Sequence, residues 1–262
     1  MGLRDGTMRH PLPNEKIWKE GFMVIRLALA ALLCLSWSGA VLAAPARIVI
    51  LRHGEKANKW KLCDIGQERA DALAANYLGR GAANSLFAPG EQPAAFLAIT
   101  LHTLELAYPA ATTWNLPITL YPVLPEEDSD EDKVETLNRR TQEAARDLMI
   151  NARWQGKTVV MVWEHKHIAN KKLEKHFPGE AVTLRQLLKL DQLEGVPENW
   201  PSGTYDYFWI VEYGNTGSDV PTGFRRIKQE LGAPYDEVPS NDWDQPNGLE
   251  DESGCDLKGA QD

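Results

Sequence analysis

Two histidines follow two buried-type strands, and the residues beside them could support chemistry on an anion. The first strand is an unbroken aliphatic run over residues 48–51, which is typical of a strand buried on both faces of a parallel sheet. It is followed at once by Arg52, His53, Gly54 and Glu55. The arginine offers a planar fork of donors suited to phosphate, and the histidine offers a nucleophile or base near neutral pH.

A second strand exit of the same kind lies 112 residues further along the chain. Residues 158–163 form another apolar run, and residues 164–168, Glu-His-Lys-His-Ile, come directly after it. In open α/β sheets, ligands bind beyond the carboxyl ends of the strands. The residues that follow two such strands can therefore lie in one crevice. The pattern therefore predicts a single site that contains both His53 and His165.

With these residues the chain resembles the histidine phosphatase superfamily, which has the phosphoglycerate-mutase-like fold. The first strand with its Arg-His-Gly-Glu exit carries the resemblance, together with the strand that ends at His165. Residues 62–70, Leu-Cys-Asp-Ile-Gly-Gln-Glu-Arg-Ala, look like the family's Leu-x-x-x-Gly-x-x-Arg-Ala helix start. The resemblance spans residues 46–212 and implies a secreted bacterial-type member with a three-layer α/β sandwich. Its central sheet would be mostly parallel, with helices on both faces.

The resemblance also implies an activity, namely phosphomonoester hydrolysis through a phosphohistidine intermediate. His53 would attack phosphorus, Arg52 would bind the phosphate, and His165 would donate to a nonbridging oxygen. Glu55 would take part in substrate binding as an orienting residue, or stand in an exposed turn, and Lys166 would bind the substrate by adding positive charge near the phosphate. The expected partner is a small phosphorylated substrate, and neither a cofactor nor a metal is expected.

One position departs from the family pattern. Residues 101–109 look like a helix start just beyond the strand 96–100, where the family carries a second phosphate-binding arginine in a pattern like Arg-x-Leu-Glu-x-Ala. Here the matching residue is His102, which we expect to contact the substrate. Because a histidine with an unperturbed pKa of about 6.5 is only partly charged at neutral pH, the sequence predicts an acid-shifted activity profile.

The proton donor for the leaving group is expected in the acidic run over residues 125–132. The family places its acid after a strand comparable to residues 117–123, so Glu126 or Glu127 is a candidate, and we assign Glu127. The alternative is a solvated first turn of a long helix that extends to Trp154, where carboxylates are favourable because of the helix dipole. The sequence does not choose between these alternatives.

Two other functions stay open on the sequence alone. One is a metal-binding hydrolase, because His53, His102, His165 and His167 are numerous enough to hold zinc, although no cysteine or carboxylate spacing completes a known metal motif. The other is a periplasmic binding protein of the same fold that kept the pocket and lost turnover.

Length and composition favour one domain that binds a small molecule. The 262 residues, 43% of them hydrophobic, can bury one substantial core, and no repeat or linker divides them. A net charge of -9 disfavours nucleic acid as a partner. We expect an α/β domain over residues 45–235. The acidic tail over residues 236–262 is poor in apolar residues, so we expect it to be disordered.

Within this domain the apolar periodicity predicts an alternation of strands and helices. The expected strands are residues 48–51, 96–100, 117–123, 158–163 and 205–213. The expected helices are residues 66–78, 101–109, from the acidic run to 154, 168–177 and 183–190.

The first 44 residues have the pattern of a secretory signal peptide. Arg26 precedes an apolar run over residues 27–35, and small residues follow up to Ala43 and Ala44. Met23 is an alternative initiator, because the residues before it make an unusual start for a signal. The alternative to cleavage is a membrane anchor, although the apolar segment barely reaches spanning length.

Export would place the mature protein in the periplasm or outside the cell, without stable membrane association. Of the three cysteines, Cys34 would leave with the signal, and Cys63 and Cys255 would remain. An oxidising compartment would allow them to form a disulfide, while Cys63 could equally be a small core residue.

Overall fold

The structure, a computed structural model, describes Gly2 and residues 44–124, 130–214, 218–246, 248–249 and 253–256. The apolar segment of the predicted signal peptide and the alternative start at Met23 lie outside these residues, and so does Glu127. The chain divides into the units Met1–Val41 and Leu42–Asp262, and all elements below belong to the second.

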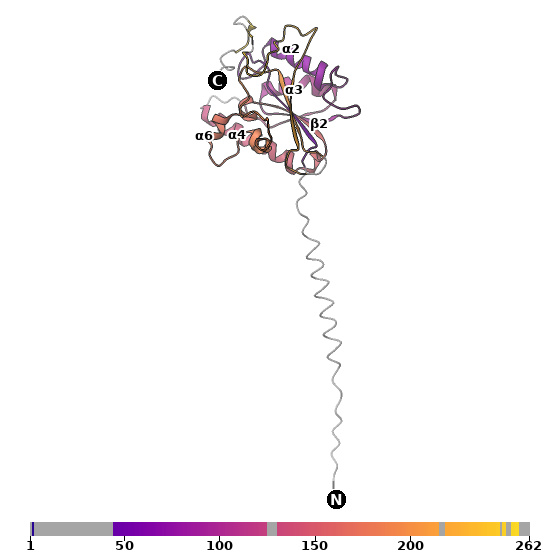
Figure 1. The fold of residues 1–262 in the computed structure, drawn as a ribbon, viewed down its shortest axis with the longest axis vertical. Coiled ribbons are helices and arrows are strands. Elements are labelled where there is room, and N and C mark those ends of the chain that lie inside the picture. Colours follow the sequence, from indigo (N-terminus) through magenta and orange to yellow (C-terminus); the bar gives the residue numbers. More distant parts are fainter. Residues whose placement is uncertain are drawn as a thin grey trace. The chain divides into compact units, whose positions relative to one another are not determined.

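A six-stranded sheet in the order β3-β2-β4-β1-β5-β6 forms the centre of this unit (Figure 1). Strands β1 to β4 run parallel to one another, β5 runs antiparallel to β1, and β6 runs antiparallel to β5. The prediction of a mostly parallel sheet is therefore confirmed. The strands are β1 (Arg47–Arg52), β2 (Pro93–Ala98), β3 (Ile118–Leu120), β4 (Thr158–Trp163), β5 (Tyr207–Glu212) and β6 (Gly223–Lys228).

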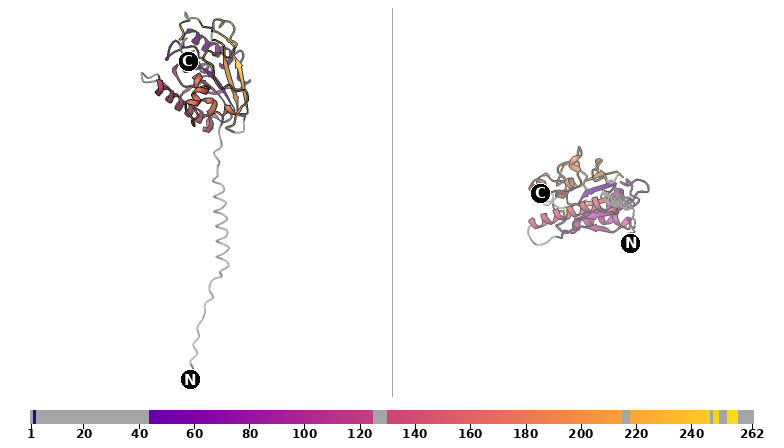
Figure 2. Two further views of the ribbon diagram at one scale, coloured as in Figure 1. Left: turned by 60° about the vertical axis from the view of Figure 1, so that its left-hand side comes forward. Right: turned by 90° about the horizontal axis from the view of Figure 1, so that it is seen from below.

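Helices cover both faces of the sheet (Figures 1 and 2). None of the helices in the described part of the chain combines the length and apolar character needed to cross a membrane. The helices are α2 (Asp64–Leu73) with the π-helical turn η1 (Ala74–Leu78), α3 (Leu101–Thr113), α4 (Asp130–Ile150), η2 (Ala152–Trp154), α5 (His165–Ile168), α6 (Lys171–His176), α7 (Leu184–Leu187) and η3 (Leu190–Gln192).

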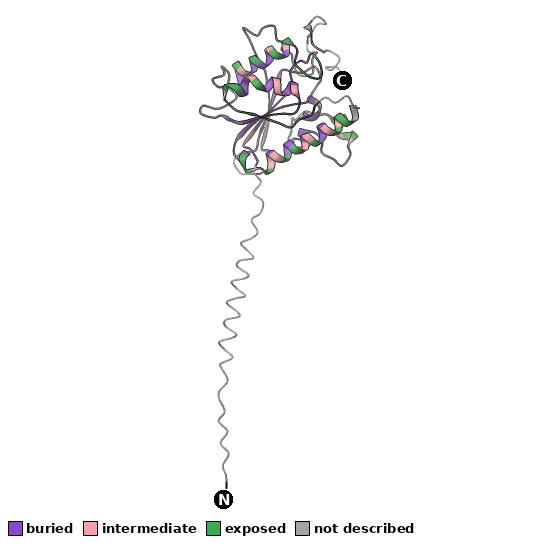
Figure 3. Ribbon diagram, turned by 180° about the vertical axis from the view of Figure 1, so that it is seen from behind, coloured by how far each residue is buried: buried purple, intermediate pink, exposed green. Residues whose placement is uncertain are grey.

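Strand β1 shows why an unbroken aliphatic run marks the centre of a three-layer fold. Ile48 and Ile50 belong to the core that the sheet shares with α4, α5 and α7, whereas Val49 and Leu51 belong to the core shared with α2 and α3. Successive side chains of a strand point to opposite faces, so every position of a doubly covered strand must be apolar. Figure 3 accordingly shows the central strands as buried. The three-layer α/β prediction is confirmed.

Besides shifted bounds of several elements, two details of the element pattern differ from the prediction. Strand β6 is not predicted, because it pairs with β5 alone and carries exposed Arg225 and Arg226, so it lacks a continuous apolar pattern. The helix expected over residues 168–177 is two short helices. Asn170 separates them, and its side chain accepts a hydrogen bond from the backbone N–H of Leu173 and so starts α6.

The described part of the acidic tail contacts the domain, in contrast to the disorder expected from its composition. Val238 is buried, and the carbonyl of Pro239 accepts a hydrogen bond from Nη2 of Arg69. The rings of Trp243 and Trp200 have centroids 5.4 Å apart. A few anchoring residues thus hold a segment whose average composition is polar.

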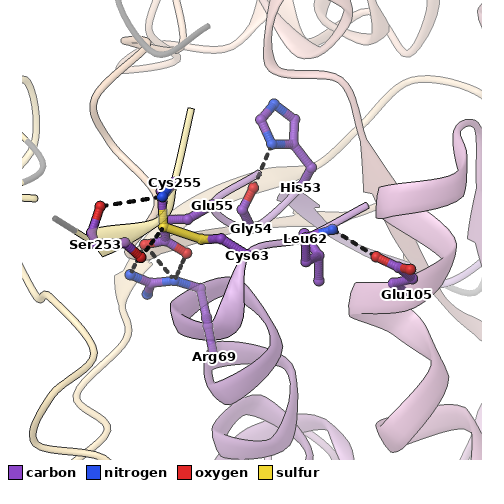
Figure 4. Close-up of a disulfide and its surroundings, with 9 residues drawn as sticks. All are labelled: His53, Gly54, Glu55, Leu62, Cys63, Arg69, Glu105, Ser253 and Cys255. Carbon is purple, nitrogen blue, oxygen red and sulfur yellow. Dashed lines mark hydrogen bonds and ion pairs between the residues drawn. A yellow bond between two sulfur atoms is a disulfide. The ribbon is translucent and has the colours of Figure 1, made fainter. Parts of the chain in front are cut away.

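A disulfide lies in the last described part of this tail. Cys255 is bonded to Cys63, which stands directly before α2 (Figure 4). The backbone N–H of Asp256 also donates to the carbonyl of Lys56. The tail is therefore attached to the segment that follows β1 and leads into α2.

Candidate active site

The carboxyl ends of three neighbouring parallel strands form the candidate site. Because β4 lies between β2 and β1, the segments that leave these strands lie side by side at one edge of the sheet. The polar residues delivered there are Arg52 and His53 after β1, Thr100 and His102 after β2, and Glu164 and His165 after β4.

His53 is held as a neutral imidazole with a defined tautomer. Its Nδ1 lies 2.7 Å from the carbonyl oxygen of Gly54 (Figure 4). A carbonyl only accepts, so Nδ1 carries the hydrogen and Nε2 carries the lone pair. Burial, and then the positive charges of Arg52 and Lys56, hold the pKa of His53 well below its usual value of 6.5. Nε2 therefore keeps an unprotonated lone pair at neutral pH.

Arg52 stands between the two histidines that the sequence placed in one site. Its Nη2 lies 3.2 Å from Nε2 of His53 and 3.3 Å from Nδ1 of His165. The two ring nitrogens are themselves 3.3 Å apart. Because a guanidinium can only donate, both ring nitrogens act as acceptors toward it. The structure thus brings Arg52, His53 and His165 together.

The loop after residue 200 fixes the orientation of Arg52. Its Nη1 donates to the carbonyls of Pro201, Ser202 and Thr204, at 3.1, 2.5 and 3.4 Å. The guanidinium carbon lies 3.9 Å from the ring centre of Tyr205, a residue that the sequence pattern did not point to. Nε of Arg52 has no partner among the described residues. Nε and Nη2 therefore remain as the donors that a phosphate could use.

His165 presents an unused donor. Since its Nδ1 accepts from Arg52, the ring hydrogen of the neutral form lies on Nε2, which is buried and has no hydrogen-bond partner in the described part of the chain. Burial, and then Arg52, hold the pKa of His165 well below 6.5. The neighbouring Lys166 is half-buried and adds positive charge to the surroundings of this ring. An unpaired buried N–H is costly, so a ligand acceptor would satisfy it.

His102 contacts a carboxylate. Its Nε2 lies 2.5 Å from Oε1 of Glu164, and the hydroxyl of Thr100 donates to the same oxygen at 2.9 Å. Thr100 is the residue before α3, and its backbone N–H donates to Oγ1 of Thr103 one turn later, which fixes the start of the helix. The ring centre of His102 lies 5.1 Å from that of His53.

Glu164 is a site residue that the sequence analysis did not single out. Its Oε2 lies 3.6 Å from Nε2 of His53. Burial alone would raise the pKa of Glu164, but the nearby His102, His53 and Lys56 outweigh it and hold the pKa well below 4.5. The sequence signal that could have pointed to Glu164 is its position directly after β4 and directly before His165.

Glu55 does not face the site, which corrects its expected role in substrate binding. It is buried and accepts hydrogen bonds from Nε and Nη2 of Arg69 at 2.9 and 2.6 Å, while Nη1 of Arg69 donates to Asp206 at 2.8 Å. A Cβ at Gly66 would lie 2.1 Å from the carbonyl oxygen of Glu55. Because Gly66 has no side chain, α2 packs closely against the segment that follows β1. Arg69, one turn further along the helix, then reaches Glu55.

A metal ion would have to compete with Arg52 for the histidine nitrogens of this site. Donor atoms of His53, Glu164 and His165 lie within 4.8 Å of one another, close enough for one ion. Nη2 of Arg52, however, already donates to both histidine nitrogens, and its positive charge opposes a second cation there. His167, expected as a fourth histidine of a metal set, instead has Nε2 at 2.9 Å from Oδ1 of Asn138.

No protein-family model and no curated protein matches this chain. Among solved structures, a mycobacterial hydrolase is 15% identical, with 72% of this chain and 93% of that chain covered and a TM-score of 0.39. A mycobacterial glucosyl-3-phosphoglycerate phosphatase is 16% identical in its native form, with 72% and 100% covered and a TM-score of 0.37. Its complex with inorganic phosphate is 14% identical, with 78% and 100% covered and a TM-score of 0.38. Similarity at this level assigns no activity to the chain.

Proposed function

We propose that this protein is a phosphomonoester hydrolase of the histidine phosphatase superfamily that acts through a phosphohistidine on His53. One observation carries the proposal. The Nδ1 hydrogen of His53 is committed to the carbonyl of Gly54, so the Nε2 lone pair faces Nη2 of the Arg52 guanidinium, beside the ring of His165. A neutral nucleophile next to preorganised donors suits attack on an anionic phosphoryl group.

In the proposed reaction, Nε2 of His53 attacks the phosphorus of a small phosphomonoester. Arg52 gives up its hydrogen bond to the ring and donates through Nε and Nη2 to phosphoryl oxygens. His165 donates a ring N–H to another oxygen, and Lys56 adds a nearby positive charge. Water then attacks the phosphohistidine, releases inorganic phosphate and restores the imidazole.

We also propose that the protein is exported and that a signal peptide is removed. The apolar segment after Arg26 supports this, as does the Cys63–Cys255 disulfide, since disulfides persist mainly in oxidising compartments. The N-terminal sequence of the protein recovered from the culture medium or the periplasm would test the export. A mature chain that begins near residue 44 is expected, and a chain that retains Met23 in the cytoplasm would contradict it.

The activity is tested by phosphate release from a panel of small phosphomonoesters and by labelling with a radioactive phosphoryl donor, quenched in alkaline detergent because phosphohistidine hydrolyses in acid. We expect activity and an acid-labile label in the wild type, and neither in His53→Ala. The matched control is His176→Ala, because His176 is an exposed histidine on α6. Full activity of His53→Ala would contradict the mechanism. Ligand binding without any label would favour the binding protein that has lost turnover.

A further inference from the structure

The carboxylate of Glu164 is fixed at one oxygen and directed to the nucleophile at the other. Oε1 lies 2.5 Å from Nε2 of His102 and accepts from the hydroxyl of Thr100 at 2.9 Å. Oε2 lies 3.6 Å from Nε2 of His53, too far for a direct hydrogen bond. The side chain is only 14% exposed. Its position is therefore set by its two donors, next to the atom that would bond to phosphorus.

Titratable or charged groups surround Glu164 from every segment of the site. Cationic or titratable groups act on it from the β1 exit, the start of α3 and the start of α5. They are Arg52, His53, Lys56, His102 and His165. Without substrate, these groups favour the carboxylate anion. A phosphomonoester at Nε2 of His53 brings negative charge next to Oε2, and a neighbouring like charge raises the pKa of a carboxyl group. Substrate binding thus favours proton uptake on Oε2.

The other carboxylates near the β1 exit are engaged elsewhere. Glu55 is bound on both oxygens by Arg69, and Asp206 is bound by the same guanidinium. Oε2 of Glu105 accepts from the backbone N–H of Leu62. Among the described residues around Nε2 of His53, Glu164 is the carboxyl group placed to exchange a proton with a group on phosphorus.

We propose that Glu164 is the general acid and then the general base of the reaction, and that His102 is the residue that positions it. This inference rests on the proposed phosphatase function. In the first step, the bond from His53 Nε2 to phosphorus forms, the bond from phosphorus to the ester oxygen breaks, and Oε2 passes its proton to that oxygen. In the second step, water bonds to phosphorus, the nitrogen–phosphorus bond breaks, and the water proton goes to Oε2.

This role accounts for the histidine where the resembled family has arginine. An arginine at this position would be charged at any ordinary pH and would bind phosphate as a fork of donors. His102 instead directs Nε2 to Oε1 of Glu164, and its Nδ1 has no partner in the described part of the chain. At this position the chain therefore lacks a phosphate-binding arginine and instead has a histidine that positions Glu164.

The experiment compares Glu164→Gln with the wild type on two substrates that differ in their need for a proton. Nitrophenyl phosphate releases an anion that is stable without protonation, whereas a simple alkyl phosphate releases an alkoxide that needs a proton. The ratio kcat/KM reports steps up to cleavage of the ester bond. We expect Glu164→Gln to lose about 10²–10⁴-fold in kcat/KM on the alkyl ester and much less on the nitrophenyl ester. Gln keeps the shape and an oxygen for the Thr100 and His102 donors.

The second step is followed by rapid mixing with nitrophenyl phosphate. Slowed water attack in Glu164→Gln should give a burst of nitrophenol and an accumulated phosphohistidine on His53. Glu194→Gln, at an exposed position, is the matched control and should behave as the wild type. Equal losses on both esters, or the absence of a burst, would overturn the role of Glu164. A label on His53 in the same experiment would still support the phosphatase function. Activity in His53→Ala would instead remove the proposed function itself.

His102→Ala provides an independent variant. If His102 positions the acid, this variant should show the same selective loss on the alkyl ester, to a smaller degree than Glu164→Gln. An equal loss on both esters would show that His102 contributes to phosphate binding instead, and would overturn its positioning role.

Discussion

Nε2 of His53 lies 3.3 Å from Nδ1 of His165, although 112 residues separate the two histidines. The relationship follows from the pairing of β1 with β4. Arg52 is in register with Trp163, and the backbone N–H of His53 continues the ladder by donating to the carbonyl of Trp163 at 3.0 Å. The two chains therefore leave the sheet together, and the residues that follow the last pair meet at its edge.

The donor on His165 is expected to stabilise the transferring phosphoryl group. Loss of one preorganised donor typically lowers kcat by about 10²–10³-fold, so we expect His165→Ala to lose about this much in phosphate release. His165→Asn, which retains an N–H, should lose less. Steady-state kinetics on nitrophenyl phosphate measure both, with the exposed His176→Ala as reference. Unchanged kcat in His165→Ala would exclude this residue from the chemistry.

The buried histidines are expected to make the fold less stable in acid. Burial lowers the pKa of His167 from 6.5 to about 4, so the unfolded chain binds a proton that the folded chain does not. The contribution of this residue is fully present above pH 6.5 and is lost as the pH falls toward 4, at about 1.4 kcal/mol per pH unit. His53 and His165, whose pKa values are also lowered, act in the same direction.

Urea unfolding at several pH values between 4 and 7 measures this effect. We expect the free energy of unfolding of His167→Gln to fall less steeply with decreasing pH than that of the wild type. The exposed His176→Gln should follow the wild-type slope. A wild-type slope in His167→Gln would show that His167 is not buried in its neutral form.

The ion pair between Arg69 and Glu55 is expected to hold α2 against the β1 exit. Both side chains are 1% exposed, and Asp206 depends on the same guanidinium. Removing one partner of a buried pair leaves an uncompensated charge and typically costs about 3–5 kcal/mol. We therefore expect Arg69→Met to lose this much free energy of unfolding, whereas Arg146→Met, at an exposed position on α4, should change little. Denaturant titrations compare them, and equal stabilities would contradict the structural role.

The disulfide is expected to stabilise the fold by closing a long loop. Cys63 and Cys255 are 192 residues apart in the chain. Loss of a native disulfide typically costs about 2–5 kcal/mol, so reductant should lower the urea midpoint of the wild type. The double variant Cys63→Ser with Cys255→Ser should show the lower midpoint with or without reductant. A midpoint of the wild type that does not respond to reductant would mean that the bond contributes little.

The sequence by itself determined the strands of the parallel core and the residues that leave them. The aliphatic runs at β1 and β4 signal burial on two faces, because a doubly covered strand has no position for a polar side chain. The glycine at position 66 and the arginine at position 69 were recognised through the resemblance to the family's helix start. These signals are local, since they depend on the period and chemistry of neighbouring residues.

Tertiary structure decided which of these residues meet and which way they face. The order of the strands brings Glu164 to His102 and His53, and no periodicity in the sequence encodes that neighbourhood. The same holds for Glu55, which turns away to Arg69 because α2 approaches closely at a glycine. Contacts between distant segments depend on how whole elements pack, so they become visible only when the chain is folded.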